Sequence, residues 1–363
     1  MSSPDPSAAA LDPAVTTLLR QAGQGESRYK LVPLSGGANN QVYRVEFEDR
    51  VPLVLKRYYF SPDDRRDRFH AEKSFYDLIM ASGMREQTPQ ALTWDRENRL
   101  GLFSWIEGRR LHAAEVTRDA VEQALSFYFA INAHRHLPEA SSAPNASEAC
   151  FDLGQHFECV ERRLSRLAGV ATDSPTGREA VDFISGRLRP AFEKYKALCA
   201  ETKLANPAPL EGTQRCLSPS DFGFHNALNQ SGDRLAFFDF EYAGWDDPAK
   251  FLCDFLCQPA VPIPRPLWSY CIESLCRPLA GGSNRERIAL LLPLYHMKWC
   301  CILLNEFLPQ ERNRRAFSQR RSPEEMESRM NEQLGKARNL LESLASVDLT
   351  QNSGFDDNLC VAR

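Results

Sequence analysis

The sequence lacks several features that mark special classes of protein. It has no uninterrupted apolar run close to the ~20 residues that a membrane-spanning helix needs. Its formal net charge is only −4, so nothing suggests binding to nucleic acid. The first residues contain neither a basic nor an apolar segment, and we therefore expect no secretory signal and a cytoplasmic protein. What remains is a chain of 363 residues, 43% hydrophobic and 25% charged, with the composition of a globular protein.

Paired cysteine motifs and a Walker A loop are also missing. The eleven cysteines are odd in number and scattered, and no Cys-x-x-Cys pair indicates a zinc site. We expect reduced, buried thiols. No Gly-Lys-Ser/Thr follows the paired glycines Gly36 and Gly37, so this is not the phosphate loop of the Walker class.

The stretch from Cys216 to Pro248 carries the clearest chemistry. An acid, Asp221, stands five residues before an amide, Asn226, and a turn then leads through a short apolar strand to a second acid, Asp239. Carboxylate and amide oxygens suit hard cations such as Mg²⁺ and can stand beside a proton acceptor. Phosphoryl transfer needs this set: one carboxylate for the attacking hydroxyl, and an amide and a carboxylate for the metal on the phosphates.

The spacing Asp-x-x-x-x-Asn, with an apolar-flanked Asp about a dozen residues later, resembles the aminoglycoside phosphotransferase/choline kinase family. Its characteristic forms are His-Gly-Asp-x-x-x-x-Asn and an Ile-Asp-Trp/Phe-Glu-like strand. Phe238-Asp239-Phe240-Glu241 is close to the second form, whereas Pro219 and Ser220 replace the His and Gly of the first. The resemblance extends over about residues 29–256.

The resemblance implies an α+β, two-lobed protein-kinase-like fold. We expect a disordered stretch and a short helix in residues 1–28, and a nucleotide-binding lobe in residues 29–108. That lobe would be a small antiparallel sheet with one main helix and a hinge near residues 103–108. Residues 109–348 would form a larger helical lobe with the catalytic and metal loops at 216–248, and residues 349–363 a flexible tail.

The same resemblance implies roles for the residues of the central stretch. Asp221 would accept the proton of the acceptor hydroxyl, and Asn226 and Asp239 would hold Mg²⁺. Glu241 could be a third acid at the metal or could point elsewhere, and the sequence leaves both open. His225 is expected to pack within the loop, and Asp246 and Asp247 to cap the following helix.

The first lobe should supply the contacts to the nucleotide. Three expected strands surround the turn at Gly36-Gly37, whose backbone N–H groups can approach phosphate oxygens. The glycines alone would equally suit a plain turn, but a lysine about twenty residues later, Lys56, favours a phosphate site. Glu72, on the next helix, is the best candidate to pair with this lysine. The residues expected at the nucleotide are Gly36, Gly37, Ala38, Asn39, Asn40, Lys56, Glu72, Phe103, Ser104, Trp105 and Ile106.

The expected activity is transfer of the γ-phosphoryl group of ATP or GTP to a hydroxyl of a small acceptor. Only seven residues separate Asp239 from Asp247, which leaves no room for the activation segment of a protein kinase. An amino alcohol, a sugar or an aminoglycoside-like compound are all candidates. The basic run from Arg312 to Arg321 could attract an anionic substrate, although a solvated face is the simpler interpretation. The alternative is a non-catalytic nucleotide-binding or partner-binding module, suggested by Pro219 and by Lys250 near a position where the family has an acid.

Overall fold

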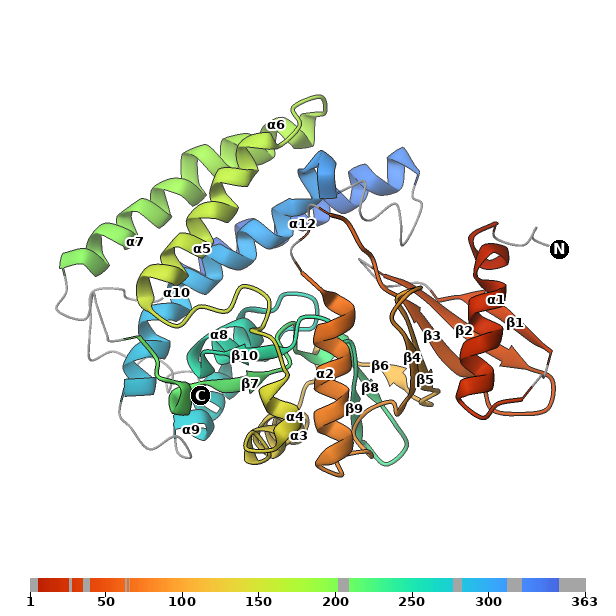
Figure 1. Cartoon of the computed structure of the whole chain (residues 1–363). Helices are drawn as coiled ribbons and strands as arrows, with labels where there is room; N and C mark the ends of the chain where they lie inside the picture. Colours follow the sequence, from red (N-terminus) through yellow and green to blue (C-terminus); the bar gives the residue numbers. More distant parts are fainter. Residues whose placement is uncertain are drawn as a thin grey trace.

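The protein folds into two lobes of different composition (Figure 1). The computed structural model describes residues 6–25, 28–34, 40–62, 64, 66–201, 209–276, 283–311 and 322–345. The smaller lobe contains α1 (Pro6–Gln21), β1 (Tyr29–Pro33), β2 (Gln41–Phe47), β3 (Leu53–Arg57), α2 (Arg68–Ala81), β4 (Ala91–Asp95) and β5 (Leu100–Ser104). Its strands form one antiparallel sheet in the order β1-β2-β3-β5-β4. The fold class expected from the sequence is confirmed.

A helix covers each face of this sheet. Side chains alternate between the two faces along a strand, and β5 shows the consequence. Leu102 shares a buried cluster with Val15 and Leu18 of α1. Phe103 instead packs against Tyr76 of α2, with 5.2 Å between the ring centroids. The second helix therefore lies between the sheet and the larger lobe (Figure 1).

The helix α2 begins later than the sequence predicted. In the sequence, Ser61-Pro62-Asp63-Asp64 predicts a helix start because acids suit the first turn, but the first helical residue is Arg68 and the N-cap is Asp67. The carboxylate of Asp64 forms ion pairs with Arg66 and Arg68. An acid before a helix can either cap the helix or form ion pairs. Asp64 forms ion pairs because Arg66 and Arg68 lie beside it.

Two further helices differ from the sequence prediction. Residues 1–10 were expected to be disordered, whereas α1 is helical from Pro6. The helix α9 (Trp268–Cys276) was not predicted. The prolines between residues 259 and 266 indicated a loop, and the helical spacing of the apolar residues after them was overlooked. The prolines end at a 3-10 turn, Arg265–Leu267, from which α9 continues directly.

The larger lobe is mostly helical. Its helices are α3 (Arg118–Ala133), α4 (Pro138–Ser141), α5 (Leu153–Arg166), α6 (Pro175–Phe183), α7 (Arg189–Glu201), α8 (Pro248–Cys257), α9, α10 (Ser283–Leu304) and α12 (Pro323–Ala345). A π-helical turn, Ile184–Leu188, joins α6 to α7. The sequence predicts a capping box at Ser283 and Glu286 that opens a helix from Ile288 to Phe307, and α10 begins at Ser283 itself.

The helix α10 forms the centre of this lobe and packs against α5, α8 and α12. The segment Arg285–Phe307 is long and apolar enough to cross a membrane by length and composition alone, with a mean hydropathy of 1.4. However, 78% of its most apolar 18-residue window is buried inside the protein, as expected for the central helix of a packed bundle.

Two small sheets connect the lobes to the central stretch of the sequence. In the first, β6 (Arg109–Arg110), β8 (Ala227–Asn229) and β9 (Leu235–Phe237) lie side by side in antiparallel pairing. In the second, β7 (Cys216–Ser218) pairs with β10 (Gly244–Asp246). The chain leaving the first lobe is thereby fixed beside the hairpin that was expected to carry the chemistry.

The cysteines in the described part of the chain form no disulfide, and all of them except Cys276 are buried. Burial raises the pKa of most of these thiols, including Cys253 and Cys257, which favours the protonated form. Three expectations concern residues outside the described part: the Gly36–Asn39 turn, the basic run from Arg312 to Arg321, and the tail at 349–363.

Candidate active site

A cluster of charged side chains joins the two lobes, formed by Lys56, Glu72, Asp239 and Glu241, and is called here the interlobe cluster. The ammonium group of Lys56, on β3, lies 2.6 Å from Oε2 of Glu72 on α2. It also forms an ion pair with Asp239 and lies 3.7 Å from Glu241. The structure thus brings together a lysine and two acids that the sequence analysis selected from positions 56, 72 and 239.

The second oxygen of Glu72 is equally constrained. Its Oε1 accepts a hydrogen bond from the backbone N–H of Phe240, at 3.0 Å. The ring of Phe240 packs against Phe75 and Tyr76 of α2, with centroid distances of 4.8 and 5.5 Å. The position of α2 therefore fixes both the lysine and the backbone directly after Asp239.

The interlobe cluster holds its lysine as a cation. Burial alone would lower the pKa of Lys56, but Asp239 and Glu72 raise it well above its usual value. Burial raises the pKa of Glu72, and the ion pair with Lys56 opposes that shift. A charged lysine within reach of an exposed carboxylate, that of Asp239, can bind the oxygens of a polyphosphate.

The loop between β7 and Asn226 presents Asp221 to solvent. The residue before it, Ser220, has a φ of +65°, in the left-handed region that non-glycine residues rarely adopt. Ser220 stands where the related family has a glycine, which explains that preference. The side chain of Asp221 is 41% exposed. Backbone strain of this kind is found at sites where one side chain must be held in place.

A residue that the sequence analysis did not select anchors this loop. Asn132, in the last turn of α3, accepts a hydrogen bond from the backbone N–H of Leu217 and donates one to its carbonyl, both at 2.9 Å. The next strand residue, Ser218, accepts a bond from the N–H of Ser220 at 3.0 Å. The loop is therefore held firmly with Pro219 in place of the family's histidine. No sequence signal identified Asn132, because a single polar residue near a helix end is common.

The hairpin β8–β9 places Asn226 next to the chain that carries Asp239. The amide nitrogen of Asn226 donates to the carbonyl of Asp221 at 2.9 Å, which leaves its oxygen as the atom to offer a ligand. The backbone carbonyl of Asn226 accepts from Phe238 at 3.1 Å. Asp239 follows with a φ of +68°, a second strained residue, and its side chain is 35% exposed.

Asn226 and Asp239 suit Mg²⁺ rather than a softer metal. Both offer hard oxygen atoms, and Mg²⁺ typically takes one or two protein ligands and completes its shell with phosphates and water. Among the described residues no group of three or more His, Cys, Asp or Glu side chains could hold a metal by itself. The donor set therefore fits a metal that arrives with a phosphate ligand.

Glu241, two residues after Asp239, is held by side chains of the first lobe. The buried carboxylate of Glu241 lies 3.8 Å from the guanidinium of Arg68 and also contacts Lys56. Asn40 donates to Glu241 and accepts from the backbone of Tyr59 at 3.0 Å. We expected Asn40 to contact phosphate, but its buried side chain anchors the end of the turn. Glu241 belongs to the same anchoring network.

The expected hinge divides into two parts. Phe103 and Ser104 lie within β5, paired with β3, and the hydroxyl and N–H of Ser104 both bond to the backbone of Gln90. The N–H and the hydroxyl of Ser104 are therefore used within the sheet, and the expectation that Phe103 and Ser104 contact the nucleotide stays a prediction. Trp105 and Ile106 follow the end of the strand, so the hinge begins with them.

His225 lies closer to the candidate base than we expected. Its Nε2 is 3.4 Å from Oδ1 of Asp221, four residues earlier. Its Nδ1 is buried and has no hydrogen-bond partner among the described residues. One edge of the ring is therefore buried in the loop, as predicted, and the other edge lies beside the exposed carboxylate of Asp221.

The segment after the hairpin is fixed by buried charges. Asp247 caps α8, as predicted, by accepting from the N–H of Ala249 at 2.7 Å. Asp246 was expected to share this role, but it forms an ion pair with Lys250 at 2.7 Å. The same lysine lies 3.2 Å from Asp254. Lys250 thus has a structural role, which removes one reason to suspect a degenerate site.

These features define the class of the molecule. A five-stranded lobe with a buried Lys–Glu pair, joined to a helical lobe with an Asp, Asn and Asp at one hairpin, is a protein-kinase-like arrangement. Residues 30–256 match the phosphotransferase enzyme family (APH), which is more than half of the chain. The chain belongs to this family. No curated protein matches the sequence.

Solved structures share the fold. The chain is similar to a spectinomycin phosphotransferase in complex with ADP and spectinomycin, at 13% identity and a TM-score of 0.57, covering 85% of this chain and 92% of that one. The choline kinase of Streptococcus pneumoniae has 14% identity and a TM-score of 0.55, over 92% and 99%. A choline/ethanolamine kinase family protein of Mesorhizobium loti has 18% identity and a TM-score of 0.52, over 91% and 94%.

Proposed function

We propose that this protein is a small-molecule kinase that transfers the γ-phosphoryl group of ATP or GTP to a hydroxyl group. The observation that carries the proposal is the interlobe cluster, in which Lys56 contacts Glu72 and Asp239 across the two lobes. Phosphoryl transfer relies on positioning and charge neutralisation, and this cluster supplies both next to an exposed acid. Membership of the phosphotransferase family supports the same reaction.

Each residue has a defined task in this proposal. Lys56, held by Glu72, binds phosphate oxygens of the nucleotide, and Trp105 and Ile106 offer backbone groups to the base. Asn226 and Asp239 hold Mg²⁺, which when bound neutralises charge on the transferred phosphoryl group. Phosphate contact by Gly36, Gly37, Ala38 and Asn39 stays an expectation from the sequence, since these residues lie outside the described part.

The chemical step requires a base beside the acceptor. Asp221 accepts the proton of the acceptor hydroxyl. At the same time the hydroxyl oxygen of the acceptor bonds to the γ-phosphorus, and the bond from that phosphorus to the β–γ bridging oxygen breaks. The products are a phosphate monoester, the nucleoside diphosphate and one proton. His225, 3.4 Å away, would orient the carboxylate of Asp221.

A small acceptor is supported by the short connection after Asp239. The strand β10 pairs with β7, and α8 begins at Pro248, so the chain is returned to the core at once. A peptide platform would have to be built from this connection. Similar structures also include an amicoumacin kinase with AMP-PNP, Ca²⁺ and its substrate bound, at 12% identity and a TM-score of 0.53.

The test is nucleotide turnover with a panel of hydroxyl compounds. The full-length protein with Mg²⁺ and ATP or GTP should release the diphosphate faster when an acceptor is present, and Asp221→Asn should abolish that increase. Asp77→Asn, an exposed carboxylate on α2, serves as the matched control. Tight nucleotide binding with no acceptor-dependent release on any compound would favour the non-catalytic alternative.

A further inference from the structure

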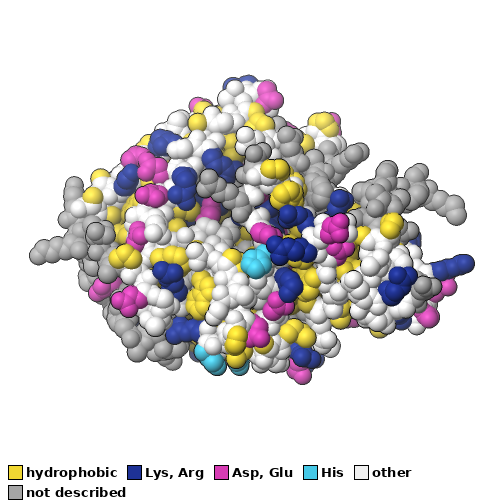
Figure 2. Space-filling view, viewed as in Figure 1, with side chains coloured by type: hydrophobic (Ala, Val, Ile, Leu, Met, Phe, Trp, Pro, Cys, Tyr) yellow, Lys and Arg dark blue, Asp and Glu magenta, His cyan; other side chains and the backbone are white. Residues whose placement is uncertain are grey.

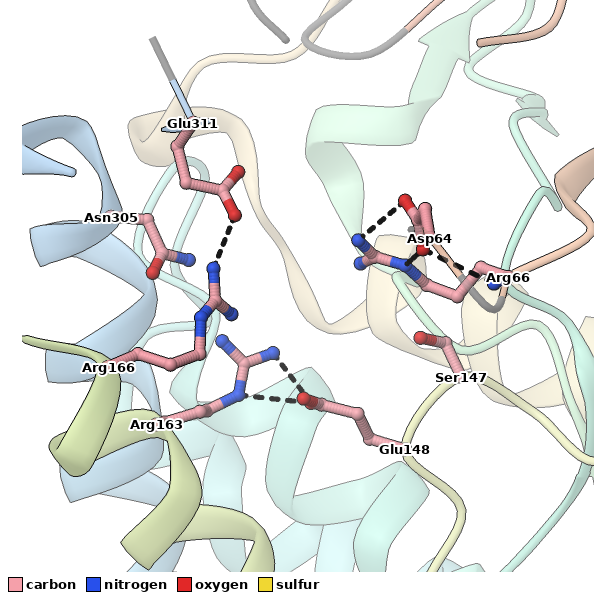
Figure 3. Close-up of a pocket in the computed structure, with 8 residues that line it drawn as sticks. All are labelled: Asp64, Arg66, Ser147, Glu148, Arg163, Arg166, Asn305 and Glu311. Carbon is pink, nitrogen blue, oxygen red and sulfur yellow. Dashed lines mark hydrogen bonds and ion pairs between the residues drawn. The ribbon is translucent and has the colours of Figure 1, made fainter. Parts of the chain in front are cut away.

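A polar pocket lies beside the candidate active site, and we call it the arginine pocket (Figure 3). Its volume is about 220 Å³, which suits a metabolite smaller than a drug-sized ligand. Two of its walls face each other in Figure 3: α5 and the end of α10 on one side, and the segment before α2 with the 145–148 loop on the other. Its lining residues are Asp64, Arg66, Ser147, Glu148, Arg163, Arg166, Asn305 and Glu311.

Backbone pairing brings the pocket close to the reacting groups. The N–H of Ser147 donates to the carbonyl of Tyr242, three residues after Asp239, at 2.9 Å. Gly244, two residues further on, pairs with Ser218, three residues before Asp221. The segment from residue 242 to residue 244 therefore connects the pocket wall at Ser147 with β7, the strand that leads into the loop carrying Asp221.

Two guanidinium groups point into the pocket from one helix. Arg163 and Arg166 are three residues apart on α5 and so lie on the same face. Figure 3 shows them adjacent, with Glu148 and Glu311 on their outer sides. Arg163 bonds to Glu148 at 3.0 and 2.6 Å, and Arg166 bonds to Glu311. Each acid orients one guanidinium, and the nitrogen atoms that the acids leave unbonded lie next to each other in Figure 3.

The spare hydrogen-bonding capacity of these arginines consists of donors. Within the described residues, Nη1 of Arg163 and both Nε and Nη1 of Arg166 make no hydrogen bond. The opposite wall adds the hydroxyl of Ser147, and Asn305, on the same side as the arginines in Figure 3, adds an amide. Although burial opposes ionisation of Glu148, Arg163 and Lys298 lower its pKa to about 2, so the ion pair persists at neutral pH.

The lining also excludes some ligands. None of the eight lining residues is aromatic or aliphatic. A trimethylammonium group is usually recognised by an aromatic cage, and an apolar group by apolar contacts, so neither suits this wall. Paired guanidinium groups with free N–H donors are instead the usual partners of carboxylates and phosphates.

We infer that the arginine pocket binds an anionic group, a carboxylate or a phosphate, of the phosphoryl acceptor. This inference rests on the proposed kinase activity and names the acceptor class as hydroxy carboxylates or hydroxylated phosphate monoesters. Arg163 and Arg166 hold the anionic end, and the hydroxyl at the other end of the molecule reaches Asp221. The arginines position the acceptor and take no part in the bond changes.

The test compares acceptors and one arginine substitution. D-glycerate, L-malate and L-homoserine represent the carboxylates, and glycerol 3-phosphate represents the phosphates. Glycerol, ethanolamine and choline lack an anionic group. We expect diphosphate release to respond to at least one anionic compound and not to its neutral counterpart. Whether the carboxylates or glycerol 3-phosphate act distinguishes the two anions.

Arg166→Gln should raise the KM for the anionic acceptor about ten- to hundred-fold and leave the KM for nucleotide unchanged. Arg166→Lys keeps the charge but not the planar fork, so its KM should lie between those of Arg166→Gln and the wild type. The matched control is Arg187→Gln, which removes a comparably exposed arginine paired with Glu342 at 3.0 Å, away from the pocket. Equal turnover of neutral and anionic acceptors, or an unchanged KM in Arg166→Gln, would overturn the inference while leaving the kinase activity intact.

If no compound is phosphorylated, that result counts against the kinase proposal alone. A binding experiment then tests the anion site. Calorimetry with D-glycerate and with glycerol 3-phosphate, in the presence of Mg²⁺ and AMP-PNP, should then show an interaction that Arg166→Gln removes and Arg187→Gln retains. No heat from either anion, or the same affinity in Arg166→Gln, would overturn the anion site itself.

Discussion

The interlobe cluster and the arginine pocket both combine basic and acidic side chains, but they differ in burial and in how many acids each basic group contacts. In the interlobe cluster, Lys56 is buried and shared among three acids, so each member depends on the others. In the arginine pocket, Arg166 is 44% exposed and pairs with a single acid. The first arrangement has one stable geometry, whereas the second leaves donors directed at a ligand.

The two arrangements suit two different tasks, binding the nucleotide and selecting the acceptor. Buried charges must be matched in number and position, because an unpaired one is costly. An exposed side chain such as Arg166 can change at a smaller cost, since ion pairs in contact with solvent contribute about 0–1 kcal/mol. We therefore expect the interlobe cluster to act on the nucleotide and the pocket wall to select the acceptor. Figure 2 shows lysine, arginine and acidic side chains interspersed across the exposed face.

The largest effect should follow from Asp221, the exposed acid of the loop after β7. Asp221→Asn should lower kcat about 10³-fold, because the amide cannot accept the proton of the acceptor. The dissociation constant of the nucleotide should change little, since Asp221 makes no contact with Lys56. Single-turnover kinetics and calorimetry measure the two quantities separately. Loss of nucleotide binding would place Asp221 in the wrong role.

The next largest effect tests the interdependence of the interlobe cluster. Lys56→Met should lower kcat/KM about 10²-fold and the free energy of unfolding by about 3 kcal/mol, because Glu72 remains buried without its cation. Adding Glu72→Gln should recover stability but no activity. Lys73→Met, which breaks the exposed pair with Asp77 on α2, should cost at most about 0.5 kcal/mol. Urea denaturation provides the comparison.

A smaller effect is expected from the amide ligand. Asn226→Ala should raise the Mg²⁺ concentration for half-maximal rate about tenfold, because one of two protein ligands is lost and the phosphates retain the metal. Chelation with EDTA should abolish turnover in the wild type. If Mg²⁺ titrations of wild type and variant coincide, Asn226 does not hold the metal.

The smallest effect concerns the opposite pH responses of two glutamates. In Glu148 the folded-state pKa of about 2 lies below the ordinary 4.5, so its stabilisation is complete above pH 4.5 and is lost as pH falls toward 2. In Glu72 the pKa is raised, so its contribution declines as pH rises above 4.5.

Unfolding free energies in urea, measured across this range of pH, should separate the two carboxyls. Glu148→Gln should remove about 1–2 kcal/mol of the stability gained between pH 2 and 5, after allowance for solvent screening. Glu72→Gln should flatten the decline at higher pH. Parallel curves for wild type and both variants would show that neither carboxyl behaves as its surroundings imply.

The sequence was sufficient for the fold class and for selecting three residues that the structure brings together in the interlobe cluster, Lys56, Glu72 and Asp239. Asp221, Asn226 and Asp239 lie within one short stretch, where local spacing is preserved by a hairpin. The alternating strands before Lys56 and the periodic helix that carries Glu72 were equally regular. Each of these signals depends on neighbours in the chain, which a sequence displays directly.

The arginine pocket could not be predicted, because its walls come from four separate segments. Arg163 and Arg166 look like the solvent face of an amphipathic helix until Glu148 and Glu311 are placed beside them. The same limitation hid the role of Asn40. Contacts over long sequence separations decide which of two ordinary roles a polar residue takes.

The most direct test of the central claim is a crystal structure of the protein with Mg²⁺ and AMP-PNP. We predict Mg²⁺ about 2.0–2.1 Å from Oδ1 of Asn226 and from the carboxylate of Asp239, with Lys56 on the phosphates. The γ-phosphate should then face Asp221. A nucleotide bound elsewhere, or a metal that touches neither Asn226 nor Asp239, would contradict the proposed site.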